Sequence, residues 1–283
     1  MSGVCHHWAM PAAPAKRLRL DQLLVERGLA PTRSRAQALL LAGDVRVGEG
    51  DAARRDLKAG DLVERSATVA VAEGPAWASR GAHKLLAALD AFEVDPAGLV
   101  AVDVGASTGG FTDVLLARGA ARVYAVDVGY GQLAERLRRD DRVVSMERVN
   151  ARSLTAATLP EPADLAVVDV SFISLALVLA PVRAVLRDGR GPILALVKPQ
   201  FEAGRADAKG GVVRDPEVHR RVLRDVAARA IALGIGMRGV IASPILGPEG
   251  NREFMAYLGA GPACAEIDER IDEAVTAAWE AAR

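Results

Sequence analysis

The sequence has few of the residues that mark secreted, metal-binding or membrane proteins. Its 283 residues include two cysteines, Cys5 and Cys264, which lie far apart and lack metal-ligand spacing. This usage argues against a disulfide scaffold or a metal site and favours a reducing compartment. The most apolar window, residues 165–185, is broken by charged residues and a proline, as in a core strand and helix. Since the first residues also lack a signal-peptide pattern, we expect a cytoplasmic protein without a membrane partner.

Net charge is also absent. The chain has 36 Lys and Arg against 36 Asp and Glu, so its overall charge neither indicates nor excludes a nucleic-acid partner. The charges are unevenly distributed, however. Residues 16–65 carry 11 basic and 8 acidic side chains, whereas residues 266–283 carry 2 basic and 6 acidic ones. A local basic excess matters more than the total for binding a polyanion, and here it lies near the N-terminus.

Residues 99–127 contain the central pattern of the sequence, a predicted strand, a glycine turn, a helix and a second strand. An apolar, β-branched run predicts a buried strand, and a helix and a second strand ending at Asp127 follow it. The turn before the helix holds glycines, which let the backbone approach a ligand closely: Gly105, Gly109 and Gly110. This combination is typical of the first half of a nucleotide-binding α/β unit, whose terminal acid accepts ribose hydroxyls. A simple strand-to-helix turn is the alternative.

Strands and helices continue to alternate after this unit. The spacing predicts strands at 142–146, 164–170 and 192–197, helices at 131–139, 175–186 and 216–233, a final strand pair at 237–242 and 253–259, and a helical tail from 268. Such an order predicts an α/β fold with an open, mostly parallel sheet and helices on both faces. Asp169 and Lys198 end two of the strands, at the sheet edge where ligands bind in such folds.

The glycine turn lacks the G-x-G-x-x-G spacing of dinucleotide-binding proteins. An acid, Asp103, stands two residues before the first glycine, where it would repel a pyrophosphate but suit a cationic ligand. The D-x-G-x-x-x-G-G pattern resembles motif I of S-adenosylmethionine-dependent methyltransferases. The resemblance implies a cofactor site in which Asp103 lies by the methionyl group, Ser107 and the glycines admit the ligand, Asp127 holds the ribose and Asn150 contacts the adenine. Dinucleotide binding is the alternative.

Residues 16–74 form a separate pattern of two short amphipathic helices and a small sheet. This segment resembles the S4 RNA-binding domain, in which basic residues contact folded RNA through its phosphates and shape. A solvated helical face would explain the same charges. We expect residues 1–15 to be a disordered leader, 75–78 a linker and 79–283 the α/β domain. The resemblance implies that five of its residues bind RNA: Arg19, Arg33, Arg35, Gln37 and Arg46. Arg80, at the start of the α/β domain, is a further candidate for RNA binding.

Four residues with ionisable side chains are spaced along the α/β segment. The order Lys84, Asp169, Lys198, Glu253 resembles the K-D-K-E tetrad of FtsJ-like 2′-O-ribose methyltransferases, and the N-P-P-[YF] signature of amino-methylating enzymes is absent. The motifs SRGAHKL, VDVSFISL, VKPQFEAGR and GPEGNREF resemble the TlyA family. The resemblance implies S-adenosylmethionine-dependent 2′-O-methylation of cytidine in 16S or 23S ribosomal RNA, within ribosomal subunits, by a monomer with no metal. Some members of that family carry a haemolysin name.

The chemistry explains why such a tetrad is needed. A ribose 2′-hydroxyl is a weak nucleophile and must lose a proton as it attacks a methyl group in line. Lys198 is the candidate nearest the hydroxyl, either as the base or as a cation that stabilises the developing alkoxide. A surface ion pair would explain any one of the four residues alone. A non-catalytic ribosome-binding factor and a membrane-damaging protein are the competing functions.

Overall fold

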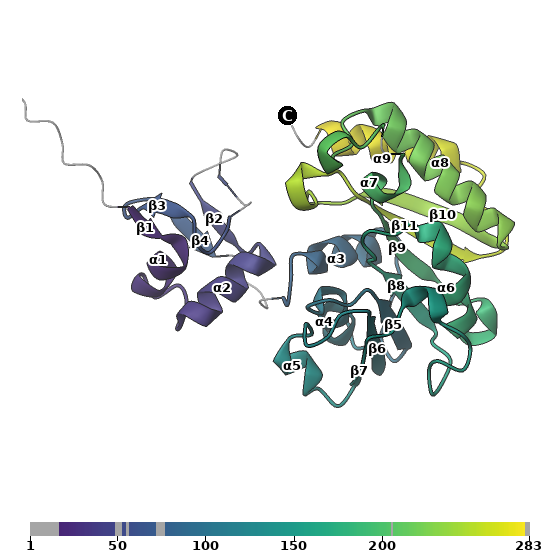
Figure 1. The fold of residues 1–283 in the computed structure, drawn as a ribbon, viewed down its shortest axis with the longest axis horizontal. Helices are drawn as coiled ribbons and strands as arrows, with labels where there is room; N and C mark the ends of the chain where they lie inside the picture. The colour runs from purple at the N-terminus through teal and green to yellow at the C-terminus, as the bar shows by residue number, and fades with distance from the viewer. Residues whose placement is uncertain (1–16, 49–52, 55–56, 72–76, 205, 281–283) are drawn as a thin grey trace, which may run out of the picture. The chain divides into compact units, whose positions relative to one another are not determined.

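The computed structural model describes residues 17–48, 53–54, 57–71, 77–204 and 206–280. The chain divides into two compact units, Met1–Ala76 and Trp77–Arg283 (Figure 1). This division falls within the segment predicted to be a linker. The predicted leader, 1–15, and residues 75–76 of the predicted linker lie outside the described residues.

The smaller unit has a core of leucines from two short helices. Its elements are β1 (Arg17–Arg19), α1 (Leu20–Glu26), α2 (Arg33–Ala42), β2 (Val45–Val47), β3 (Leu62–Glu64) and β4 (Val69–Val71). Leu20, Leu23 and Leu24 are fully buried on one face of α1, as their helical spacing predicts. The hydroxyl of Thr32 accepts from the backbone N–H of Arg35 and begins α2. The strands form two separate antiparallel pairs, β1 with β3 and β2 with β4, rather than one small sheet.

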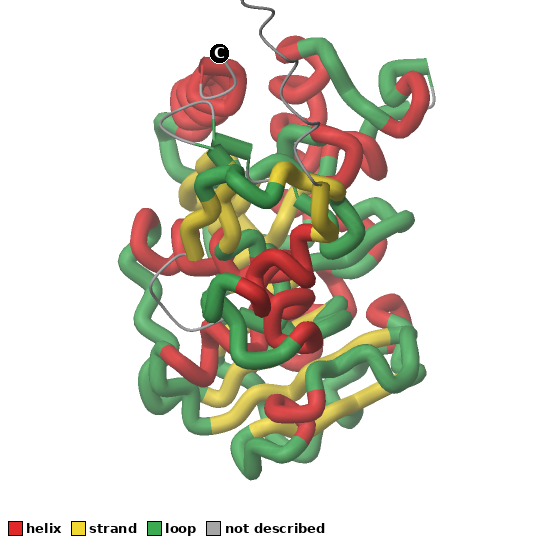
Figure 2. Tube along the Cα trace, turned by 90° about the vertical axis from the view of Figure 1, so that its left-hand side faces the viewer, coloured by secondary structure: helices red, strands yellow, loops and turns green. Residues whose placement is uncertain are grey.

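The larger unit is built on a seven-stranded sheet in the order β10-β11-β9-β8-β5-β6-β7, whose strands are yellow in Figure 2. The five strands from β9 to β7 are parallel, whereas β11 pairs antiparallel with β9 and with β10. The strands are β5 (Val100–Val104), β6 (Arg122–Asp127), β7 (Val143–Glu147), β8 (Leu165–Val168), β9 (Ile193–Val197), β10 (Ile235–Ala242) and β11 (Phe254–Ala260). The predicted α/β fold with a mostly parallel sheet and a final strand pair is confirmed.

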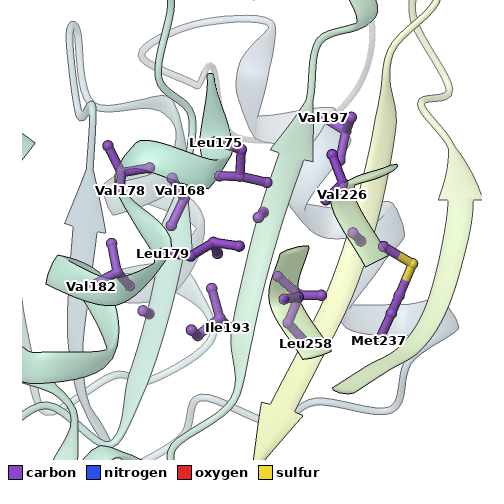
Figure 3. Close-up of a cluster of buried hydrophobic side chains, with 14 of the residues drawn as sticks. Val168, Leu175, Val178, Leu179, Val182, Ile193, Val197, Val226, Met237 and Leu258 are labelled. Atoms are coloured by element: carbon purple, nitrogen blue, oxygen red, sulfur yellow. The ribbon is translucent and has the colours of Figure 1, made fainter. Parts of the chain in front are cut away.

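Helices cover both faces of this sheet. They are α3 (Gly81–Ala91), α4 (Gly110–Ala117), α5 (Glu135–Arg138), α6 (Leu179–Val185), α7 (Pro199–Glu202), α8 (Pro216–Ala232) and α9 (Ile267–Glu280). On one face, side chains of α6 and α8 pack on strand residues such as Val168 and Val197 (Figure 3), and α9 contributes to the same cluster. On the other face, α3 and α4 pack on Val167 and Leu194. Because both faces are covered, the parallel strands consist of nearly continuous apolar residues.

One local prediction is wrong. The helix predicted at 131–139 is a single turn, α5, because the backbone N–H groups of Gly129 and Gly131 donate to carboxylates and hold a loop instead. In the turn before α3, the hydroxyl of Ser79 accepts from the N–H of Gly81, and the helix begins after Arg80. Among the described residues, no helix combines the length and apolar character needed to cross a membrane.

Candidate active site

The carboxyl ends of the parallel strands border a cavity of about 750 Å³. A cavity of this size suits a nucleoside-containing ligand, since ligand sites span roughly 300–1,000 Å³. It is lined by the turn after β5, the end of β6, the segment after β7 and the segment after β8. The lining includes five predicted site residues: Gly105, Ser107, Asp127, Asn150 and Asp169. Gly109 and Gly110 are absent from this lining and pack instead on Leu137 and Ser79.

The glycine turn is held close to the neighbouring strand. Gly105 has φ +89°, and a Cβ added there would lie 2.4 Å from the carbonyl oxygen of Asp169. Only glycine fits both this backbone conformation and this approach. Asp127 stabilises the same turn by accepting from the N–H of Ser107 at 2.8 Å and from the N–H of Gly129 at 2.6 Å. Each carboxylate oxygen of Asp127 keeps a second lone pair for a ligand hydroxyl.

Asp103 lies beneath this turn and outside the cavity lining. Its side chain is fully buried, and Oδ2 accepts from the N–H and the hydroxyl of Thr112 at 2.8 and 2.7 Å. Thr112 is in the first turn of α4, whose N-cap residue Gly109 supplies no side-chain cap, so Asp103 takes over that role. Oδ1 is buried without a hydrogen-bond partner among the described residues. Burial raises the pKa of Asp103 to about 7, and the nearby Asp169 adds to this effect.

The four tetrad residues form two ion pairs. Lys84, on α3, pairs with Glu253 just before β11, and their side chains are 8% and 0% exposed. Lys198, at the end of β9, lies 2.5 Å from Asp169 Oδ1 at the end of β8. Lys198 Nζ also donates to the hydroxyl of Ser171 at 2.7 Å. Each lysine therefore has a carboxylate partner that orients its ammonium group.

Strand register brings the two ion pairs to the same edge of the sheet. Val197 of β9 stands opposite Phe254 of β11, so Lys198 and Glu253 are the adjoining residues of the two strands. Gln200, two residues beyond Lys198, donates to Glu253 Oε1 at 3.4 Å. Gly81, one turn before Lys84, is also close to the other pair, since a Cβ there would lie 3.8 Å from Asp169 Oδ2. The predicted tetrad thus lies in one cluster beside the cavity.

The sequence reasoning missed residues of the segment that follows β8. Ser171 and Phe172 line the cavity, and Phe172 is 91% exposed with φ +64°. Its ring contacts that of Phe201, with the ring centroids 5.0 Å apart. The polar Ser171 two residues past Asp169 was a usable signal, because a strand's carboxyl end is where such side chains meet ligands. The exposure of an aromatic residue cannot be read from its type.

The residues expected to bind RNA in the smaller unit fall into two groups. Arg19, Arg33 and Gln37 all donate to the carboxylate of Asp21, which is fully buried. Hydrogen bonds from Arg19 first, and then from Gln37 and Arg33, hold the pKa of Asp21 well below its usual range. Arg35 and Arg46 are exposed. In the larger unit, Arg80 is half-buried immediately before α3.

Comparison with known proteins assigns the family. A model of the FtsJ-like methyltransferases matches residues 77–260, and one of the S4 domain matches residues 18–49. The chain is 50% identical over 246 residues to the 16S/23S rRNA (cytidine-2′-O)-methyltransferase TlyA of Mycobacterium tuberculosis, covering 86% of this chain and 90% of that protein. The chain belongs to the TlyA family. The fold assignment and the family resemblance drawn from the motifs are both confirmed.

Other TlyA relatives carry a different name. The chain is 36% identical to Hemolysin A of Brachyspira hyodysenteriae over 242 residues, which cover 85% of this chain and 99% of that protein. A solved structure from Streptococcus thermophilus, also named as a hemolysin, has a TM-score of 0.73 at 40% identity and covers 94% of this chain and 97% of its own. Both names thus occur within one family and one fold.

Proposed function

We propose that this protein transfers a methyl group from S-adenosylmethionine to the 2′-hydroxyl of a cytidine in ribosomal RNA, with its S4 unit binding the RNA. The observation that carries the proposal is the cluster of two carboxylate-held lysines at the sheet edge beside a nucleoside-sized cavity. The TlyA relative named for 16S/23S cytidine 2′-O-methylation supports the choice of substrate. A monomeric state and a cytoplasmic location remain predictions.

The described residues fit S-adenosylmethionine. When bound, this cofactor supplies an electrophilic methyl group on a positively charged sulfur. Gly105 lines the cavity without a side chain that would fill it, and Asp127 has lone pairs available for the ribose hydroxyls. Asn150 lies in the cavity wall, where it would contact the adenine. Among the described residues, a buried oxygen of Asp103 has no partner, which would favour a positive charge nearby.

Lys198 is the residue we assign to the proton of the ribose hydroxyl. Asp169 and Ser171 hold its Nζ at the edge of the cavity, and the side chain is 11% exposed. As a base, Nζ would take the proton; as an ammonium, it would stabilise the oxyanion that develops during the attack. Glu253, just before the strand that adjoins β9, and its partner Lys84 on α3 would orient the same hydroxyl.

The surroundings of the cavity suit an unstacked nucleotide. A single-stranded nucleotide can bring its 2′-hydroxyl to the sheet edge, and proteins bind such unstacked bases by stacking on aromatic rings. Phe172 presents a largely exposed ring at the cavity, supported from behind by Phe201. In the S4 unit, Arg35 and Arg46 are the exposed cations that we assign to phosphate contacts.

The test is methylation of purified ribosomal subunits with radiolabelled S-adenosylmethionine, followed by mapping of the modified nucleotide. Label at a cytidine 2′-oxygen supports the proposal, and label on a base or none at all refutes it. Lys198→Ala provides the control: it should lose transfer while its Kd for S-adenosylmethionine, measured by calorimetry, stays near that of the wild type. Wild-type turnover in this variant would contradict the role of Lys198. Failure of the wild type to bind the cofactor would favour a non-catalytic ribosome-binding factor.

A further inference from the structure

The cavity wall that follows β8 is held from the segment that carries Lys198. This wall comprises residues 169–177 and ends in a short 3-10 helix, η3 (Leu175–Leu177). At its start, Lys198 contacts Asp169 and Ser171. At its far end, Glu202, the last residue of α7, accepts from the hydroxyl of Ser174 at 2.7 Å and from the N–H of Leu175 at 2.6 Å.

Glu202 is placed as a structural anchor rather than as a surface charge. Its side chain is 5% exposed, and both of its oxygens are used by the wall. Ser174 caps η3, because its hydroxyl also accepts from the N–H of Ala176. A charged acceptor that binds both the capping hydroxyl and a free N–H of the helix fixes where that helix begins. Among the described residues, Arg229 forms an ion pair with Glu202 at 3.8 Å, and because it is half-exposed it contributes little.

The wall carries residues that would contact the cofactor and the RNA nucleotide. Ile173, Ser174 and Leu177 line the cofactor cavity, and Phe172 projects into solvent from a left-handed backbone conformation. Lys198 immediately precedes the short helix α7, and Glu202 is its last residue. Their contacts therefore hold the wall at its start and again at Ser174 and Leu175. A shift of η3 would move the cofactor wall and loosen Ser171 from Lys198 at the same time.

We propose that Glu202 is a positioning residue for methyl transfer, which holds the wall 169–177 in register with Lys198 so that the methyl donor and the reacting hydroxyl are aligned. This inference rests on the proposed function for its catalytic consequence. The clamp, by which we mean the two hydrogen bonds from Ser174 and Leu175 to Glu202, is present without any ligand. Glu202 does not touch the reacting atoms. It holds the wall in position through the two hydrogen bonds that it accepts.

The decisive variants are Glu202→Ala and Glu202→Gln. Alanine removes both hydrogen bonds. Glutamine keeps the shape: its oxygen accepts from the N–H of Leu175, and its NH₂ donates to the hydroxyl of Ser174. We expect Glu202→Ala to raise the Kd for S-adenosylmethionine and lower kcat/KM by about ten-fold or more, since it removes two hydrogen bonds to a charged acceptor, which are stronger than neutral ones. We expect Glu202→Gln to remain within about three-fold of the wild type, because one neutral hydrogen bond replaces each charged one. Arg229→Ala, which leaves both hydrogen bonds intact, is the matched control.

Amide hydrogen exchange on the ligand-free protein tests the clamp separately from the reaction. The N–H of Leu175 should exchange faster in Glu202→Ala but not in Glu202→Gln or Arg229→Ala. Equal losses of cofactor affinity and kcat/KM in Glu202→Ala and Glu202→Gln would show that the charge of Glu202 matters instead of the clamp, and would overturn the proposal. Faster exchange with unchanged Kd and kcat/KM would overturn it too. If the wild type transfers no methyl group, the proposed function fails, while the exchange result still decides whether Glu202 holds the wall.

Discussion

Replacing Lys84 with methionine should destabilise the larger unit strongly, beyond any effect on catalysis. Glu253 would lose its cationic partner in a site where its side chain is 0% exposed. Its remaining neighbour, the amide of Gln200 at 3.4 Å, is a weak donor, and a Cβ at Gly247 would lie 2.4 Å from Oε1, which leaves little space for water. Breaking a buried pair by removing one partner costs about 3–5 kcal/mol, and we expect Lys84→Met to fall in this range.

The double variant Lys84→Met with Glu253→Met separates this penalty from the loss of a contact. Two apolar side chains of similar size leave no buried charge, and such replacements of buried pairs are often neutral or stabilising. We therefore expect the double variant to regain most of the stability while remaining inactive. Lys198→Met should cost less, below about 2 kcal/mol, because its partner Asp169 is 23% exposed and water can solvate it.

Urea unfolding followed by tryptophan fluorescence measures these differences. A Trp8→Phe background confines the signal to Trp77 and Trp279, both in the larger unit. With an m-value of about 3 kcal/mol/M, a loss of 3–5 kcal/mol shifts the midpoint by about 1–1.7 M. A loss below about 1 kcal/mol in Lys84→Met would refute the reasoning, because that is the size expected for an exposed pair. So would a double variant no more stable than the single one.

Two further predictions follow from the carboxylates of the two units. Burial raises the pKa of Asp103 to about 7, so the folded protein binds a proton between about pH 4 and 7 that the unfolded chain lacks, and this group adds stability as the pH falls. His219, whose burial lowers its pKa to about 4, changes stability with pH in the opposite direction. The contribution of Asp103 is therefore measured as the difference in urea midpoint between Asp103→Asn and the wild type, from pH 5 to 8. A difference that stays constant over this range would contradict the prediction for Asp103. In the S4 unit, Arg33→Ala should lower stability because it removes a hydrogen bond to buried Asp21, whereas Arg35→Ala should leave stability unchanged and weaken RNA binding with a smaller salt slope. Equal melting temperatures for these two variants, or RNA binding by Arg35→Ala that matches the wild type across salt concentrations, would contradict this assignment.

Much of the fold was predictable because its signals are local. The apolar runs of β5, β8 and β9 identify buried strands, and the positions of Asp169 and Lys198 at strand ends predict that they meet at one edge. Glu253 was identified from the family motif, because the sequence does not reveal the antiparallel pairing of β11 with β9 that brings it to this edge. The assignment of these residues to catalysis came from the family motifs, and it remains a prediction until variants are tested.

What could not be predicted depends on contacts between distant segments. Asp21 reads as a favourable charge at a helix start, but its burial under Arg19, Arg33 and Gln37 depends on how α1 and α2 pack. Glu202 reads as an ordinary acid in a polar loop, and only the fold brings it to Ser174. The loop in place of the helix predicted at 131–139 likewise depends on carboxylates that side-chain periodicity does not reveal.

The position of β11 has a consequence for the order in which the protein becomes active. This strand comes last in sequence among the strands yet lies between β9 and β10, so the sheet is completed only when the C-terminal part of the chain arrives. The contact between Lys84 and Glu253 spans 169 residues, and contacts of such separation close slowly because of the loop entropy that they cost. During synthesis, Lys84 and Lys198 therefore emerge from the ribosome without the carboxylate that completes the site. The newly made protein gains its full set of reactive groups only after β11 has been translated and has paired with β9.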